Sequence, residues 1–274
     1  MTAAADATHR TPNHPLGPGG IADSRPPLHG GALPPTPPEA PTGLTAAPVI
    51  LDFVTPPAEH RQGEGSFAGV WRLPVRAYSR GDRLYEAEAT AEATYIIEAG
   101  LVALELNAPR PRIVALAGPG DVVGALAPGH GAYLDNATAL SGEVAVRVLD
   151  ERAQAELSAS ELSALLLGAA AARVITLTHA LEDGEEPVPA RVARALLRLG
   201  TRFGQTMADG TVRLTLPLTH DTLAAMVGAA RETTTAVVSQ LREAHLVDGT
   251  RGSYRIRPAQ LAEFALEAAL AAGR

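Results

Sequence analysis

Residues 216–247 read LPLTHDTLAAMVGAARETTTAVVSQLREAHLV, and this stretch decides the fold. It predicts two helices joined by a tight turn. Thr219 is suited to the N-cap of the first helix because its hydroxyl can accept a hydrogen bond from a free N–H group of the first turn. Gly228 begins the predicted turn, where glycine permits a backbone of positive φ. The second helix is predicted over residues 231–244.

The segments on either side of this stretch complete a winged helix-turn-helix. Residues 190–203 predict an earlier helix with arginines on one side and apolar residues on the other. Asp209 and Gly210 turn the chain into a short alternating strand at 212–216. After the second helix, residues 246–256 predict a small hairpin, the wing. Strand, helix, glycine turn, helix and wing in this order are typical of a domain that inserts a helix into the major groove of DNA.

In such a domain the first residues of the second helix face the edges of the bases. Here they are Arg231, Glu232, Thr234 and Thr235. Arginine can donate two hydrogen bonds to guanine, and glutamate can accept one from the cytosine amino group. The alternative for Arg-Glu-Thr taken alone is a solvated helix start, but the order of the surrounding elements favours base contact.

Residues 158–184 predict one long helix that ends before Pro187. Its apolar residues recur every three or four positions, which is the spacing of a single helix face. They are Leu162, Leu166, Ala170, Val174, Leu177 and Leu181. This face could pack on the chain's own β-domain, or on the same helix of a second subunit. The second alternative is favoured because the stripe is longer than a small barrel can cover.

Upstream of this helix, residues 49–157 carry the signals of β-structure. Short apolar segments alternate with Gly-Asp and Ala-Gly turns, which predicts a small barrel or roll. Residues 1–48 are rich in Pro, Gly, Ala and Thr, and they predict a disordered extension. The predicted organisation is therefore an extension, a β-roll domain, a dimerisation helix at 158–184, and a winged helix-turn-helix domain at 187–274.

Charge is distributed unevenly along the chain. The 274 residues carry a formal net charge of −7. Residues 187–274 contain 11 Arg and 7 acidic residues, whereas residues 1–186 contain 12 Arg and 23 acidic residues. A positive segment can contact the phosphates of DNA, and the acidic remainder is expected to lie away from them.

Composition excludes several classes of function. The chain has no cysteine, so disulfides, thiolate nucleophiles and cysteine-ligated zinc or iron–sulfur clusters are excluded. We find no phosphate-binding loop, no G-x-S-x-G and no H-E-x-x-H motif. No run of about 18 apolar residues and no secretory signal is present, so we expect a cytoplasmic protein without a membrane span.

The chain resembles the cyclic-AMP receptor protein and fumarate–nitrate regulator family of bacterial transcription factors, although residues 1–70 lie largely outside the resemblance. The resemblance is closest over residues 216–247. It extends more weakly over residues 76–256, with Gly-Asp turns at Gly81 and Gly120 and the turn glycine Gly100. It implies an α+β fold: an N-terminal β-roll of the cyclic-nucleotide-binding type (a jelly roll), a long dimerisation helix and a C-terminal winged helix-turn-helix.

The resemblance also assigns roles to residues of the DNA-binding motif. Arg231 and Glu232 occupy the positions of the family's first two base readers, and Thr219 and Thr233 the positions that contact phosphate. The family's third common reader, an arginine, is Ala236 here, which cannot donate a hydrogen bond. One base position is therefore expected to be read loosely or through DNA shape. His220 and Thr235 complete the predicted DNA-contacting set.

In the effector pocket this sequence departs from the family. The family has a glutamate that binds the ribose, and this chain has Ala125 at that position. The family has an Arg-Ser pair that binds the phosphate, and this chain has Asp135-Asn136 there. A carboxylate at 135 would repel a phosphate, so we expect no cyclic-AMP binding in the family's usual manner. Haem bound through His130 or His179 is an alternative, but a lone histidine is more often a packed or surface residue. We therefore predict no cofactor.

Three functions compete on this sequence. The favoured one is a homodimeric transcriptional regulator that reads a palindromic operator, with half-sites about 34 Å apart. It is expected to act without cyclic AMP; the alternative is control by a cyclic nucleotide or another small ligand in the β-roll. The resemblance also implies contact with RNA polymerase through the loop at residues 205–210. The others are an enzyme with a DNA-binding appendage, which the motif search disfavours, and a ligand-binding module that never contacts DNA.

Overall fold

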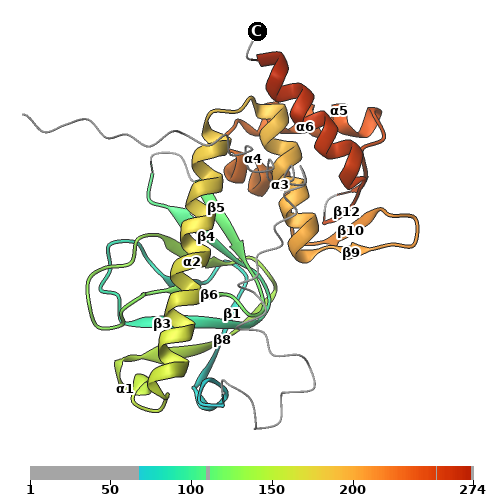
Figure 1. Ribbon diagram of the computed structural model, residues 1–274. Coiled ribbons are helices and arrows are strands. Elements are labelled where there is room, and N and C mark those ends of the chain that lie inside the picture. Colours follow the sequence, from blue (N-terminus) through green and yellow to red (C-terminus); the bar gives the residue numbers. More distant parts are fainter. Residues whose placement is uncertain (1–67, 109–111, 251, 273–274) are drawn as a thin grey trace, which may run out of the picture. The chain divides into compact units, whose positions relative to one another are not determined.

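The computed structural model describes residues 68–108, 112–250 and 252–272 (Figure 1). The predicted disordered extension at 1–48, and the first part of the predicted β-roll domain from residue 49, lie outside the described residues.

The first domain is a β-roll of two four-stranded antiparallel sheets, as the sequence predicts. In the first sheet the order is β1 (Val75–Ser79), β8 (Glu143–Asp150), β3 (Ala93–Ala99) and β6 (Val122–Gly124). In the second it is β2 (Arg83–Tyr85), β7 (Asn136–Ala139), β4 (Val102–Leu106) and β5 (Arg112–Ala117). A short 3-10 helix, η3 (Val70–Arg72), precedes β1.

Alternation and turn chemistry explain why these residues form strands. In β8, Val144, Val146 and Val148 are buried while the residues between them are more exposed, the period expected of a half-buried strand. Gly100 links β3 to β4 with a φ of 86°. A Cβ atom at Gly100 would lie 2.4 Å from the carbonyl oxygen of Glu143, so only glycine is accommodated at this turn.

The sequence prediction missed three strands of the roll, β1, β2 and β7. The inner strand β7 has the sequence NATA, in which Thr138 is the one residue that favours strands, whereas Asn and Ala are depleted in them. Ala137 and Ala139 are nevertheless buried, because β7 pairs with β2 on one side and β4 on the other.

A long helix follows the β-roll, as predicted. After the short α1 (Glu151–Gln154), α2 spans Ala159–Gly184. It begins with a capping box in which Ser158 and Glu161 satisfy each other's backbone N–H groups. The next helix, α3 (Val188–Phe203), starts two residues earlier than predicted. Pro189 lies within its first turn, where a proline costs no hydrogen bond.

The C-terminal domain is a winged helix-turn-helix with α4 (His220–Val227), α5 (Arg231–Glu243) and a four-stranded sheet. The sheet order is β11 (Val247–Thr250), β12 (Ser253–Ile256), β10 (Val212–Thr215) and β9 (Gln205–Thr206). The chain then forms α6 (Pro258–Ala272), which packs on α3 and was not predicted. Its signal was the proline at the start of an Ala- and Leu-rich run.

The apolar residues of helix α2 do not form one stripe as predicted, because some are buried against the roll and others are exposed. Its buried side chains toward the roll are Leu165 and Ala169, with Leu162 and Leu166 packed beside them. The rest of its apolar surface is open. Large exposed side chains occur at Leu167, Val174, Ile175, Leu177 and Leu181.

The composition of α2 also qualifies the expectation about membranes. Within the described parts of the chain, it is the one helix whose length and apolar composition would suit a membrane span. Its buried contacts with the β-roll, and an arginine in its middle that is paired with a roll carboxylate, give this composition another explanation.

Candidate nucleic-acid interface and the β-roll interior

The turn between α4 and α5 has the geometry that the sequence predicts. Gly228 ends α4 with φ 63° and ψ 41°, in the left-handed region. Ala229 then donates its N–H to the carbonyl of Ala224 at 3.1 Å, which closes the turn. The core beneath the turn includes Leu223, Val238 and Leu241, all buried, so the angle between the two helices is fixed by packing.

The start of α5 is exposed to solvent. Arg231, Glu232 and Thr233 are all exposed. The Arg231 side chain is 56% exposed, and its Nε lies 3.4 Å from Oδ1 of Asp221 on α4. This weak surface pair directs the guanidinium across the turn without burying it. Asp221 lies in the first turn of α4, where its negative charge also suits the helix dipole.

The first turn of α5 has no side-chain cap. Ala230 occupies the N-cap position, and no side chain accepts a hydrogen bond there. The first N–H groups of a helix have no partner within the helix, and together with the helix dipole they attract anions. The beginning of α5 therefore combines an exposed guanidinium with free backbone donors, which suits a DNA phosphate or base edge.

The predicted residues on α4 support this end of the domain. The hydroxyl of Thr219 accepts a hydrogen bond from the N–H of Thr222 at 3.0 Å, which confirms its N-cap role. Nδ1 of His220 lies 3.0 Å from Oγ1 of Thr235 on α5. This contact holds the beginning of α4 against the second turn of α5.

One predicted base-facing residue is misplaced. Thr234 is fully buried, and its hydroxyl donates to the carbonyl of Ala230 at 3.0 Å. Position 234 faces the domain core because it lies one turn before Val238, so Thr234 cannot reach a base. Ala236, which replaces the family's third reader, is exposed.

The interior of the β-roll is filled by its own aromatic rings. Tyr85 stacks on Tyr133 with ring centroids 4.2 Å apart, and on Tyr95 at 5.6 Å. All three tyrosines are buried in the core of the roll. The hydroxyl of Tyr133 accepts a hydrogen bond from the N–H of Ala93 at 3.0 Å. Burial raises the pKa of both Tyr85 and Tyr95 far above the ordinary value, so both hydroxyls stay protonated.

The carboxylate of Asp135 lies beside these rings and has internal partners. It accepts a hydrogen bond from the hydroxyl of Tyr85 at 3.0 Å and one from Nη2 of Arg173 at 2.7 Å. Burial raises the pKa of Asp135, and the guanidinium of Arg173 opposes the rise. The repulsion expected between position 135 and a phosphate is therefore offset by Arg173, a residue that the sequence reasoning did not connect with this site.

A cavity of about 70 Å³ lies between the roll and α2, lined by residues that include Thr94, Ala125, Asp135, Arg173 and Leu177. Sites for small organic ligands are typically about 300–1,000 Å³. Ala125 is buried and offers no side-chain hydrogen bond to a sugar. Positions 125 and 135 therefore do not supply the side chains that the family resemblance implies for holding a cyclic nucleotide.

The histidines considered for haem do not form a metal-binding cluster. Nδ1 of His130 lies 3.4 Å from the carbonyl of Pro128. Within residues 68–108, 112–250 and 252–272, no group of three or more His, Asp or Glu residues is arranged to hold a metal ion.

Comparison with known proteins agrees with this architecture. A Crp-like helix-turn-helix domain matches residues 190–264, and a cyclic nucleotide-binding domain matches residues 75–161. A CRP-like cAMP-activated global transcriptional regulator from Mycobacterium tuberculosis is 34% identical over 162 residues, which cover 57% of this chain and 71% of that protein.

Solved structures share the fold. FixK2 from Bradyrhizobium japonicum superposes with a TM-score of 0.59 at 21% identity, covering 70% of this chain and 96% of that chain. At that identity the likeness concerns the fold alone. A CRP/FNR-family regulator from Thermus thermophilus gives a TM-score of 0.52 at 26% identity, covering 71% of this chain and all of that one. With its β-roll, long helix and DNA-binding helix-turn-helix, the chain belongs to the CRP/FNR family of bacterial transcriptional regulators.

Proposed function

We propose that this regulator acts as a homodimer, binds a palindromic operator through Arg231 and Glu232, and needs no cyclic AMP to do so. It has no enzymatic activity in this proposal, and it works in the bacterial cytoplasm, where the chromosome lies. The single observation that carries the proposal is the exposed, uncapped start of α5, where Arg231 and Glu232 both face solvent.

The chemistry of this helix start supports sequence-specific binding. Arg231 can donate two hydrogen bonds to one guanine, and Glu232 can accept from a cytosine amino group. Four further residues would position the helix, either through direct phosphate contacts or by holding α4 on α5. They are Thr219, His220, Thr233 and Thr235. Phosphate contacts fix the register of the protein, and base contacts specify the sequence.

The exposed face of α2 supports a dimer. Leu167, Val174 and Leu181 are exposed and follow each other at seven-residue intervals, with Leu177 between the last two. A seven-residue repeat of apolar side chains is the pattern by which two helices pack along a common seam. Two copies related by a two-fold axis would present two α5 helices to successive major grooves, so the operator is expected to be palindromic.

The interior of the roll supports independence from cyclic AMP. Ala125 and Asp135 replace the groups that would hold the ribose and the phosphate. Both carboxylate oxygens of Asp135 already accept hydrogen bonds, one from Tyr85 and one from Arg173. The relative from Mycobacterium tuberculosis is described as cAMP-activated, which favours control by a cyclic nucleotide as the second candidate. That candidate requires Arg173 to leave Asp135 and the cavity to expand.

The proposal includes a contact with RNA polymerase. The loop that follows β9 turns at Gly210, with φ 76°, and Ala208 and Asp209 are exposed. Asp209 accepts hydrogen bonds from the N–H and the hydroxyl of Thr211, which fix the shape of this turn. An exposed turn within the DNA-binding domain, held in shape by these hydrogen bonds, is suited to contact a second protein bound to the same DNA.

The experiment that tests the proposal is selection of duplexes from a random pool by the purified full chain, with and without added cyclic AMP. We expect enrichment of a two-fold symmetric sequence in the absence of any nucleotide. Enrichment only when cyclic AMP is present would support the second candidate. No enrichment under either condition would contradict both.

Two variants make the selection specific to the proposed residues. Arg231→Ala with Glu232→Ala is expected to abolish the sequence preference while the far-ultraviolet circular dichroism spectrum is unchanged. Arg213→Ala is the matched control, since Arg213 is an exposed arginine on β10 and lies outside the helix-turn-helix. It removes one arginine from the same domain and should leave the selected sequence unchanged, although it lowers the net charge, which the double variant does not. Loss of preference in the control would show that the loss of an arginine anywhere in the domain, rather than of a base contact, determines the result.

A further inference from the structure

Asp135 and Arg173 join the β-roll to the middle of α2. Nη2 of Arg173 lies 2.7 Å from Oδ2 of Asp135, and the Asp135 side chain is only 3% exposed. The second carboxylate oxygen accepts the hydroxyl of Tyr85 at 3.0 Å. Both oxygens therefore have a partner, one from the roll and one from the helix.

This ion pair continues the face of α2 that lies on the roll. Leu165, Ala169 and Arg173 are spaced four residues apart, so they lie on the same side of the helix. The first two are buried by apolar packing, and between Ala169 and Asp183 no described side chain of α2 is buried. Over that interval two polar contacts join α2 to the described part of the roll: the Asp135–Arg173 ion pair, and the hydrogen bond that Arg112 donates to the carbonyl of Ala180 at 3.3 Å.

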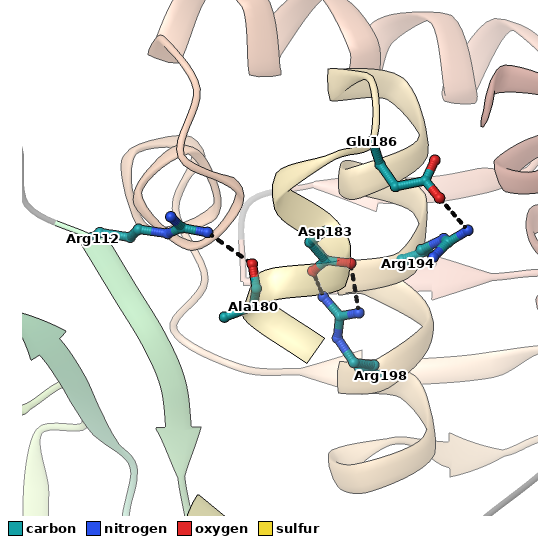
Figure 2. Close-up of polar contacts among 6 residues, drawn as sticks. All are labelled: Arg112, Ala180, Asp183, Glu186, Arg194 and Arg198. Atoms are coloured by element: carbon teal, nitrogen blue, oxygen red, sulfur yellow. Dashed lines mark hydrogen bonds and ion pairs between the residues drawn. The ribbon is translucent and has the colours of Figure 1, made fainter. Parts of the chain in front are cut away.

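Two further ion pairs join the end of α2 to the first helix of the DNA-binding domain. Both oxygens of Asp183 face the guanidinium of Arg198 on α3, with one contact at 3.1 Å (Figure 2). Glu186, just beyond α2, pairs with Arg194 of α3 at 2.8 Å. Any rotation of the C-terminal half of α2 about the roll would therefore be transmitted to α3.

We propose that the Asp135–Arg173 ion pair is built into the chain in place of a bound ligand: it fixes α2 on the roll, and Arg173 and Asp135 are positioning residues for specific DNA binding. The inference rests on the proposed function, since it concerns the geometry in which the two α5 helices reach the operator. Neither residue touches DNA. Both act through α2 and through the ion pairs of α2 with α3.

The ion pair is expected to affect specific DNA binding but not non-specific DNA binding, which a general packing role would not do. A ligand or contact can shift a conformational equilibrium only by its differential interaction with the two states. The Asp135–Arg173 ion pair exists only when α2 lies on the roll, so it favours that state in every molecule, without an effector. Non-specific attraction to phosphates does not depend on the spacing of the two α5 helices, so it should be insensitive to the ion pair.

The test measures the affinity of the full chain for the selected operator and for a scrambled duplex of the same length, well below the melting temperature. Arg173→Gln is expected to weaken operator binding about 5- to 150-fold, the range of typical coupling between sites, and to leave binding to the scrambled duplex unchanged. Arg173→Lys keeps the positive charge and should retain most of the operator affinity. Asp135→Asn, which is nearly isosteric, should weaken operator binding as Arg173→Gln does, and the double variant no further.

The outcomes separate this inference from the proposed function. If the wild-type chain does not distinguish operator from scrambled duplex, the proposed function fails. If the wild-type chain distinguishes them, and the folded Arg173→Gln or Asp135→Asn variant binds the operator as tightly as wild type, the positioning role is wrong. Equal losses for both duplexes would also overturn it, because they would indicate general destabilisation. Should Arg173→Gln fail to fold, Asp135→Asn supplies the same comparison.

Discussion

The start of α5 and the interior of the β-roll use charged residues in opposite ways. Arg231 and Glu232 are exposed, and Arg231 forms a weak surface pair with Asp221. Asp135 and Tyr85 are buried, and their polar atoms bond to each other and to Arg173. The charged side chains at the start of α5 are therefore accessible to an external partner, whereas the polar side chains inside the roll bond to one another.

The difference parallels the matches and departures that the family resemblance implies. In the helix-turn-helix, the positions implied for base readers depart from the family at Ala236. In the roll, the position implied for the ribose holds Ala125, and the pair implied for the phosphate is Asp135-Asn136. Four predictions test this comparison.

The largest effect is expected from emptying the roll. Tyr85→Ala removes the ring that stacks on both Tyr133 and Tyr95 and the hydroxyl that donates to Asp135. We expect the free energy of unfolding to fall by about 3–5 kcal/mol, as for other large aromatic residues truncated in a core. The measurement is equilibrium unfolding in urea. Tyr85→Phe, which keeps the stack, should lose only about 1 kcal/mol.

The same variant tests whether the roll can accept a nucleotide once space is made. Ala125 and Asp135 remain, so cyclic AMP should not raise the melting temperature of the Tyr85→Ala variant. A clear rise would mean that the rings alone keep the nucleotide out, and it would weaken the argument from the charged residues.

Sequence reasoning succeeded where local rules and function agree. Thr219, Gly228 and the Arg231 helix start each carry a local signal, and each was found as predicted. The roll was harder to predict, because its inner strand β7 contains one strand-favouring residue, Thr138, and is held by its neighbours. Thr234 was misassigned because both roles, base reader and core residue, were compatible with the sequence; burial decided between them.

The ion pair of Asp135 could not be predicted from the sequence. Its partners Tyr85 and Arg173 lie 50 and 38 residues away. Neither separation falls within a helix or hairpin, so no periodicity connects them. The resemblance to the family identified position 135 as unusual, but only the fold brings Arg173 of α2 to it. Contacts between distant residues depend on the packing of whole elements, so local patterns in one sequence do not reveal them.

The second prediction concerns the one reader position that the DNA-binding domain has lost. Ala236→Arg restores the arginine that the family resemblance implies at an exposed position of α5. We expect one additional base pair in each half-site to be specified, and discrimination at that pair to rise by about 1–3 kcal/mol. Repeating the duplex selection with the variant measures this.

Gln240→Arg is the control for that variant, because it adds the same charge one turn further along the exposed side of α5. It should tighten binding to all duplexes alike. If Ala236→Arg also tightens binding to all duplexes without sharpening any base position, residue 236 does not face the bases.

A third prediction addresses the cap that supports the reader helix. Thr219→Ala removes the oxygen that accepts the N–H of Thr222 at 3.0 Å, and the free energy of unfolding should fall by about 1 kcal/mol. Thr219→Ser keeps this oxygen and should be close to wild type in urea unfolding. Equal loss in both variants would indicate that the methyl group of Thr219, rather than its cap, is the stabilising part.

The smallest expected effect is on the pH dependence of the free energy of unfolding, to which two carboxylates, Glu161 and Asp135, are expected to contribute with opposite sign. Hydrogen bonds from Ser158 and from the N–H of Gly69, the latter at 2.8 Å, lower the pKa of Glu161 below its ordinary value of 4.5. The stability that Glu161 adds is therefore present above pH 4.5 and is lost as the pH falls through its lowered pKa. Because this carboxylate is near the surface, we expect well under about 1 kcal/mol.

Asp135 has the opposite sign, because its raised pKa means that the folded chain binds a proton more readily than the unfolded one. Its contribution to stability therefore falls as the pH rises from 3.8 through the raised pKa. Unfolding free energies of Glu161→Gln and Asp135→Asn, measured across this acidic range, should differ from wild type with slopes of opposite sign. Slopes of the same sign would mean that Asp135 is stabilised as a carboxylate as strongly as Glu161 is, so that Arg173 outweighs the cost of burial.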